Sequence, residues 1–177
     1  MDIDWHELFE YRDGVLIFKE RPRECFDSLL GGSVFNSKYA GKPAGGPAVG
    51  REHYMVAIKV NGIRVNASVH RIIWEMFNFP VPEGMVVDHI DQCPANNKIE
   101  NLRLATRSTN AMNRPAPVNN SSGVKNVTWV KLKNKWKVYI TSKKKLYFGG
   151  YYSDLELAEL VAHELREKIH GEFACHD

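Results

Sequence analysis

Four polar residues in the middle of the chain have types and spacing that suit hydrolysis of a phosphodiester. Asp88 and His89 are adjacent in a short apolar segment, Asn101 precedes a second such segment, and Asn110 follows it. Carboxylate and amide oxygens suit a hard cation such as Mg²⁺. An imidazole with a pKa of about 6.5 is neutral often enough at neutral pH to accept a proton from water. The set can therefore supply the general base and the cation that this hydrolysis needs.

The elements around these residues are expected to fold back on one another. The pattern predicts a helix at 69–77, a strand at 85–90, a polar loop at 91–100, a strand at 102–105 and a helix that begins at Thr106. The hydroxyl of Thr106 can cap that last helix. If the two strands pair as a hairpin against the helix, the four polar side chains meet in one cleft.

This part of the chain resembles a known family. Residues 87–91, 96–104 and 106–110 are similar to the ββα-metal (His-Me finger) core of phage-type HNH homing endonucleases, and the wider run from His70 to Asn113 is similar as well. The resemblance implies a Mg²⁺-dependent endonuclease, or one that uses another divalent cation such as Mn²⁺, which nicks or cleaves duplex DNA at a specific site. It also implies 3′-hydroxyl and 5′-phosphate products.

The same resemblance implies roles for the four residues. His89 would activate the water, and Asp88 and Asn110 would hold the metal. Asn101 would either orient His89 or brace the hairpin.

Several other polar residues are open to a structural interpretation. Asn96 and Asn97 favour turn positions, because asparagine readily hydrogen-bonds its own backbone. His70 and Arg71 either cap the predicted helix or contact phosphate, so Arg71 is a DNA-binding candidate. The remaining histidines have no cluster in the sequence and are interpreted as ordinary: His6, His53, His163, His170 and His176.

The first 68 residues are predicted to be rich in β-structure. Residues 15–19 are expected to form a strand, and the segment 31–50, with its many glycines and prolines, a surface loop. Residues 54–60 and 63–67, separated by Asn61-Gly62, carry a strong β-hairpin signal.

The C-terminal part begins after a linker rich in Pro, Asn and Ser at 115–123. Residues 119–151 hold eight lysines and no acid, whereas 154–177 hold seven acids. Strands are predicted at 125–130, 136–142 and 145–151, followed by a helix at 153–170. A capping box at Ser153 and Glu156 would start that helix, and the stripe along one side of it would consist of Leu157, Leu160, Val161, Glu164 and Leu165.

Residues from Ser122 to Ala174 are similar to the Apetala/ethylene-response-factor DNA-binding domain. In the middle strand, Lys137, Tyr139 and Thr141 alternate with apolar residues, so they share a wet face. The resemblance implies double-stranded DNA as the partner, with DNA-facing residues Lys125, Thr128, Lys137, Tyr139, Lys145 and Tyr147. Plant members use mostly arginine where this chain has lysine and threonine, which leaves base specificity open. From the residues alone, a solvated lysine face is equally compatible.

These observations predict an α+β protein with an N-terminal β-hairpin region at 1–68, an HNH core at 69–114, a linker at 115–123 and a C-terminal three-stranded antiparallel sheet plus one helix at 124–177.

The chain has 177 residues, a formal net charge of +3 and three well-separated cysteines. We expect no membrane span and a cytoplasmic, phage-encoded protein in a bacterial host. The alternatives are a non-catalytic DNA-binding regulator on an HNH scaffold and an RNA or structure-specific nuclease. The oligomeric state stays open.

Overall fold

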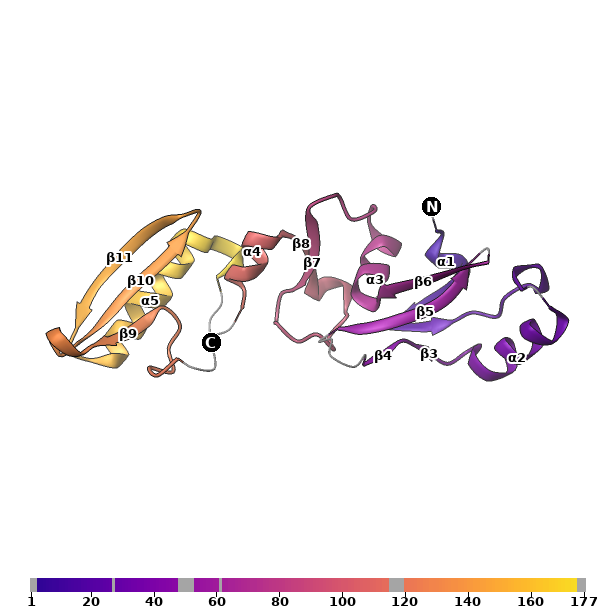
Figure 1. Ribbon diagram of the computed structural model, residues 1–177, viewed down its shortest axis with the longest axis horizontal. Coiled ribbons are helices and arrows are strands. Elements are labelled where there is room, and N and C mark those ends of the chain that lie inside the picture. Colours follow the sequence, from indigo (N-terminus) through magenta and orange to yellow (C-terminus); the bar gives the residue numbers. More distant parts are fainter. Residues whose placement is uncertain (1–2, 27, 48–52, 61, 115–119, 175–177) are drawn as a thin grey trace. The chain divides into compact units, whose positions relative to one another are not determined.

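The computed structural model describes residues 3–26, 28–47, 53–60, 62–114 and 120–174. Helices and antiparallel sheets confirm the predicted α+β class. The chain divides into two compact units, Met1–Leu104 (unit 1) and Ala105–Asp177 (unit 2) (Figure 1). None of the described helices has the length and apolar character needed to cross a membrane.

Unit 1 contains two three-stranded sheets among its described residues. The first has the order β1-β2-β3, and the second has the order β4-β5-β6. Their strands are β1 (Phe9–Arg12), β2 (Val15–Phe18), β3 (Pro43–Ala44), β4 (Gly46–Pro47), β5 (Tyr54–Val60) and β6 (Ile63–Ser68). The β5–β6 pair is antiparallel, with Val60 opposite Ile63 and Met55 opposite Ser68, so the predicted hairpin is confirmed.

The helix predicted at 69–77 is confirmed as α3 (Val69–Phe77). It buries Ile72 and Ile73 completely and lies beside β5 and β6 (Figure 1). A two-stranded sheet, β7 (Met85–His89) and β8 (Leu102–Thr106), follows it. The shorter elements of unit 1 are α1 (Trp5–Leu8), η1 (Arg23–Cys25) and η2 (Ile99–Asn101).

One hydrophobic core holds unit 1 together. It joins Phe9 and Leu16 of the first sheet, Val56 of the second, and Val87 and Leu102 of the β7–β8 sheet. Residues assigned from the sequence to the N-terminal region and to the HNH core therefore share one core. The domain boundaries themselves stay a prediction, and residues 115–119 of the predicted linker lie outside the described residues.

The surface loop predicted at 31–50 is wrong over its first part, because Leu29–Tyr39 form helix α2. The hydroxyl of Ser28 caps it by accepting from the amide of Gly31. Phe35 and Tyr39, one turn apart, pack their rings against Phe18 of β2. This aromatic packing outweighs the low helix propensity of the two glycines in the first turn. Residues 48–50 lie outside the described residues.

Unit 2 contains an antiparallel sheet of order β11-β10-β9 with helix α5 along one face (Figure 1). This confirms the predicted three strands and one helix. The elements are α4 (Arg107–Met112), β9 (Val127–Val130), η3 (Lys131–Lys133), β10 (Lys135–Ser142), β11 (Lys145–Tyr152), α5 (Leu155–His170) and η4 (Gly171–Phe173).

Two details predicted for the C-terminal helix are wrong. Its N-cap is Asp154, whose carboxylate accepts from the amide of Leu157, and the negative charge suits the positive end of the helix dipole better than Ser153 would. The stripe that packs on the sheet includes the predicted Val161 and Leu165 but centres on the fully buried Ala158 and Ala162, whereas the predicted Leu157 and Leu160 are 49% and 68% exposed. Small side chains allow this helix to approach the sheet closely.

Substitution of Ile72 tests the shared core of unit 1. Ile72→Ala should lower the free energy of unfolding by about 2–5 kcal/mol, because the side chain is fully buried and leaves a cavity. Ile63→Ala is the matched control, since Ile63 lies on the exposed side of the same unit and its loss should cost much less. Urea denaturation of both variants measures the difference, and equal losses would contradict the assigned core.

Candidate nuclease site

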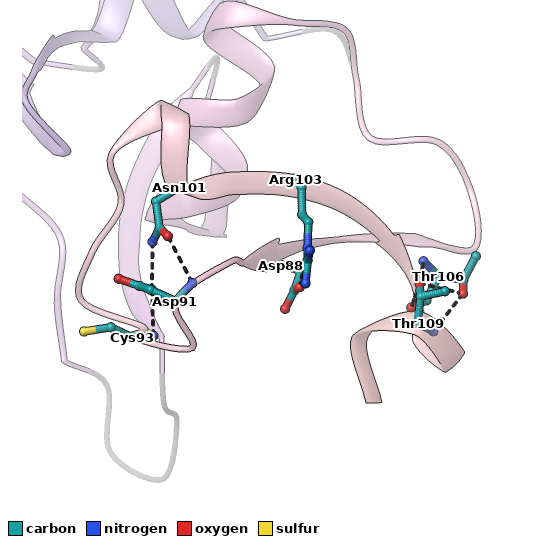
Figure 2. A network of polar contacts seen from close by, with 7 residues as sticks. All are labelled: Asp88, Asp91, Cys93, Asn101, Arg103, Thr106 and Thr109. Atoms are coloured by element: carbon teal, nitrogen blue, oxygen red, sulfur yellow. Dashed lines mark hydrogen bonds and ion pairs between the residues drawn. The ribbon is translucent and has the colours of Figure 1, made fainter. Parts of the chain in front are cut away.

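The loop between β7 and β8 is braced by Asn101. Its Oδ1 accepts from the amide of Asp91 at 3.1 Å, and its Nδ2 donates to Asp91 Oδ1 at 2.9 Å and to the carbonyl of Asn96 at 2.8 Å. Figure 2 shows Asn101 and Asp91 facing one another at the loop end of the two strands. Of the two roles expected for Asn101, bracing the hairpin is the one that these contacts support.

Asp91 itself is held as a carboxylate by this network. Burial alone would raise its pKa, but hydrogen bonds from the side chain of Asn96, the amide of Cys93 and the side chain of Asn101 outweigh burial and lower it. The carboxylate of Asp91 thus holds the β7–β8 loop in place, and this loop brings Asn96 and Asn97 back toward β7.

Asp88 lies on β7 and pairs with Arg103 of β8. The Nε of Arg103 donates to Asp88 Oδ2 at 3.0 Å, and Figure 2 shows the two side chains facing one another between the strands. Asp88 is 5% exposed and the side chain of Arg103 is 13% exposed, so the buried carboxylate has a cationic partner within the protein. The guanidinium offsets part of the solvation that the carboxylate loses on burial.

His89 is 4% exposed and is oriented by Asn97. Its Nε2 lies 3.0 Å from Asn97 Oδ1, while Asn97 Nδ2 donates to the carbonyl of Ala95. Because a carboxamide oxygen only accepts, Nε2 carries the hydrogen and Nδ1 carries the lone pair. The interpretation of Asn97 as an ordinary turn residue missed this contact: the side chain is buried and touches the imidazole directly.

Two more histidines surround His89, and the interpretation of His53 as an isolated residue is wrong. The ring centroids of His53 and His70 are 4.5 Å apart, those of His70 and His89 are 5.0 Å apart, and those of His53 and His89 are 5.5 Å apart. The register of the β5–β6 hairpin explains this meeting. Since Met55 pairs with Ser68, the residue two positions before Met55 lies beside the start of α3, where His70 stands.

His70 is buried and stays neutral. Burial, followed by the nearby charges of His53, His89 and Arg71, lowers the pKa of His70 to about 3. Its Nδ1 is buried without a hydrogen-bond partner among the described residues. Arg71, by contrast, is half exposed and forms an ion pair with Glu75 one turn along α3, with Nε and Oε1 2.9 Å apart.

Asn110 lies on α4 and therefore belongs to unit 2. Thr106 caps this helix as predicted, because its hydroxyl accepts from the amide of Thr109 and the Thr109 hydroxyl accepts from the amide of Thr106 (Figure 2). The convergence of Asn110 with Asp88 and His89 stays a prediction.

The strand register of unit 2 divides the predicted DNA-facing residues between two faces. Directly paired residues share a face, so Thr128, Lys137 and Tyr151 lie together, and Tyr139 lies with Phe148. Tyr147 pairs with the buried Ile140 and Lys145 pairs with Ser142, which places both on the opposite face. A bulge at Gly149 between the two pairs keeps Phe148 and Tyr151 on the same face, with their ring centroids 5.2 Å apart.

Cations line that first face. The Nζ of Lys137 lies 4.6 Å from the ring centroid of Tyr139, and the Nζ of Lys133 lies 3.9 Å from that of Tyr151. We call Thr128, Lys133, Lys137, Tyr139, Phe148 and Tyr151 the aromatic-lysine face. Lys125 is engaged elsewhere: its amine donates to the carbonyls of Met112 and Arg114.

Comparison with known proteins identifies the family. Residues 67–112 match the family described as HNH endonuclease. Protein 3.8 of Escherichia phage T7 is 36% identical over 107 residues, which cover 59% of this chain and 86% of that protein. The chain therefore contains an HNH endonuclease domain and is related to Protein 3.8 over most of that protein's length.

Two further relatives of this HNH protein carry the family name. An uncharacterized HNH endonuclease of Acanthamoeba polyphaga mimivirus is 26% identical over 127 residues, covering 72% of this chain and 64% of the relative. An SPbeta prophage-derived protein of Bacillus subtilis, named as an HNH homing endonuclease, is 38% identical over 101 residues, covering 56% of this chain and 47% of the relative. No solved structure matches the chain.

The depressed pKa of His70 predicts a pH dependence of stability. An unfolded histidine takes up a proton below about pH 6.5, whereas folded His70 resists protonation down to about 3. The unfolded state therefore binds more protons in this window, and the free energy of unfolding should fall by about 2 kcal/mol between pH 7.5 and 5 because of this residue. Urea denaturation in EDTA should show a flatter pH profile for His70→Gln, and an unchanged profile would contradict the buried neutral imidazole.

Proposed function

We propose that this HNH protein is a divalent-metal-dependent endonuclease that hydrolyses phosphodiester bonds of double-stranded DNA. The observation that carries the proposal is the orientation of His89 by Asn97, beside Asp88, inside the segment that matches the HNH family. The phage and prophage origin of two relatives, one of them named as a homing endonuclease, favours cleavage at a specific site.

His89 acts as the general base in this proposal. With the Nε2 hydrogen held by Asn97, the lone pair of Nδ1 accepts a proton from water as the water oxygen attacks phosphorus. The bond from phosphorus to the 3′-oxygen then breaks, which gives the 3′-hydroxyl and 5′-phosphate ends that the family resemblance implies. The half-buried ring of His53 stacks on the ring of His89, with centroids 5.5 Å apart.

Asp88 and Asn110 would hold the divalent cation. Their donors fit a hard ion such as Mg²⁺ or Mn²⁺, because both offer oxygen, and the ion pair with Arg103 holds Asp88 in place. A bound cation supplies charge stabilisation at the phosphate and the leaving oxygen. Asn101 contributes by bracing the loop through Asp91, which keeps Asn97 in place against His89.

The aromatic-lysine face of unit 2 would bind the duplex. Thr128, Lys137 and Tyr139 are the predicted DNA-facing residues that lie on it. The strand register adds Phe148 and Tyr151, and the contact with the Tyr151 ring adds Lys133. Lysines can contact phosphates while flat rings cover sugars, and a small sheet can enter a major groove. Arg71, exposed beside the nuclease core, is a further candidate for a phosphate contact.

Removal of the proposed base tests the catalytic part. His89→Ala should slow plasmid cleavage in Mg²⁺ by at least about a hundredfold, since a positioned base contributes roughly 10²–10⁴ in rate. Its dissociation constant for DNA should change little. His163→Ala removes a histidine from α5 instead and serves as the control. Cleavage by His89→Ala at close to the wild-type rate would refute the assignment.

Removal of one lysine tests the DNA-binding part. Lys137→Ala should weaken binding, more at low than at high salt, and should reduce the slope of log affinity against log salt by about one. Lys145→Ala deletes the same charge from the opposite face of the same sheet and should have a smaller effect. Fluorescence anisotropy with a labelled duplex measures both, and equal effects of the two substitutions would argue against the aromatic-lysine face.

A further inference from the structure

The three imidazoles around His89 form a cluster whose geometry suits a metal ion other than Mg²⁺. His53, His70 and His89 each offer a ring nitrogen, and these three nitrogens all lie within 4.8 Å of one another. They come from the residue before β5, the start of α3 and the end of β7, so three elements of one core hold them. We call them the three-histidine cluster.

The ligand chemistry of this cluster differs from that of Asp88 and Asn110. Imidazole nitrogens suit Zn²⁺ and similar transition-metal ions, whereas Mg²⁺ prefers oxygen. Zinc bonds to histidine are about 2.0–2.1 Å long, which requires the three nitrogens to close to separations of roughly 3.3 Å in a tetrahedral array. His53 is half-buried and precedes its strand, so it is the member of the cluster whose side chain is least confined.

The surroundings of the cluster also suit a metal ligand. A metal-bound histidine usually donates its second ring N–H to an acceptor that fixes its orientation. Asn97 Oδ1 provides this acceptor for Nε2 of His89, which directs the lone pair of His89 to Nδ1. In His70, Nδ1 is buried and has no hydrogen-bond partner among the described residues, as expected for a nitrogen whose partner is an ion.

We propose that His53, His70 and His89 bind a transition-metal ion, Zn²⁺ in particular, and that the bound ion withholds His89 from hydrolysis. The inhibitory half rests on the proposed function, because the lone pair that would coordinate the ion is the one that would accept a proton from water. A single nitrogen cannot do both. Mg²⁺ at the oxygen donors and Zn²⁺ at the three-histidine cluster would then have opposite effects on cleavage.

The binding half is tested with the metal alone. Isothermal titration of the full chain with Zn²⁺, and the visible absorption of bound Co²⁺, should show an ion whose affinity falls at least tenfold in His53→Gln and in His70→Gln. His163→Gln, on α5, is the matched control and should bind as wild type does. Equal affinity of wild type and His53→Gln, or no binding by wild type, would overturn the site. His53 is the main test position because it is the least buried of the three.

The inhibitory half is tested by plasmid cleavage in Mg²⁺ at increasing Zn²⁺. Wild-type cleavage should fall as Zn²⁺ rises, and the concentration that halves each variant's own rate should be at least tenfold higher for His53→Gln than for wild type. Stimulation by Zn²⁺, or equal inhibition of both proteins, would overturn this half. If wild type does not cleave DNA in Mg²⁺ at all, the proposed function fails, while the titration still decides the binding site.

Discussion

The hydrogen bond between Asn97 and His89 is the interaction on which the functional account depends. It joins the β7–β8 loop to the end of β7, and it determines which imidazole nitrogen carries the lone pair. The loop reaches this position because Asn101 and Asp91 tie its two ends together. The conformation of the β7–β8 loop therefore determines the tautomer of His89, because it positions the side-chain oxygen of Asn97.

Burial gives this site a character different from that of an open cleft. Asp88 and His89 are almost inaccessible, and each has a polar partner within the protein: Arg103 pairs with Asp88, and Asn97 binds His89. Burial also makes a positive charge on the neighbouring His70 costly, as its lowered pKa shows. A neutral imidazole can accept a proton or bind a transition-metal ion. Because His89 is almost inaccessible, both functions depend on whether water or the ion can reach its ring.

Much of the fold could be predicted from the sequence because its signals are local. Asn61-Gly62 between two alternating segments predicts the β5–β6 hairpin, and the spacing of Ile72, Ile73 and Met76 predicts α3. Helix α2 could not be found in this way, because its glycines disfavour a helix and its stabilising partner, Phe18, is distant in the sequence.

The candidate site was predictable only in part, for a similar reason. Asp88, His89 and Asn101 stand out by type and spacing, but His53 and Asn97 act through contacts that cross the fold. The hairpin register contains the missing information on His53, since pairing Met55 with Ser68 brings the start of β5 to the start of α3. Asn97 contacts His89 because its side chain is buried although it lies in a loop, and no residue pattern in the sequence indicates that burial. The register also separated Lys145 and Tyr147 from Lys137 and Tyr139.

The tautomer of His89 is the most direct measurement of the central claim. Multiple-bond ¹⁵N–¹H NMR of the ring in EDTA at pH 7.5 distinguishes an imidazole protonated at Nε2 from one protonated at Nδ1. The account predicts the Nε2–H form in the wild-type chain and its partial loss in Asn97→Ala. An Nδ1–H form in the wild type would contradict the account, because the lone pair would then point at Asn97 and be lost to both proton transfer and metal binding.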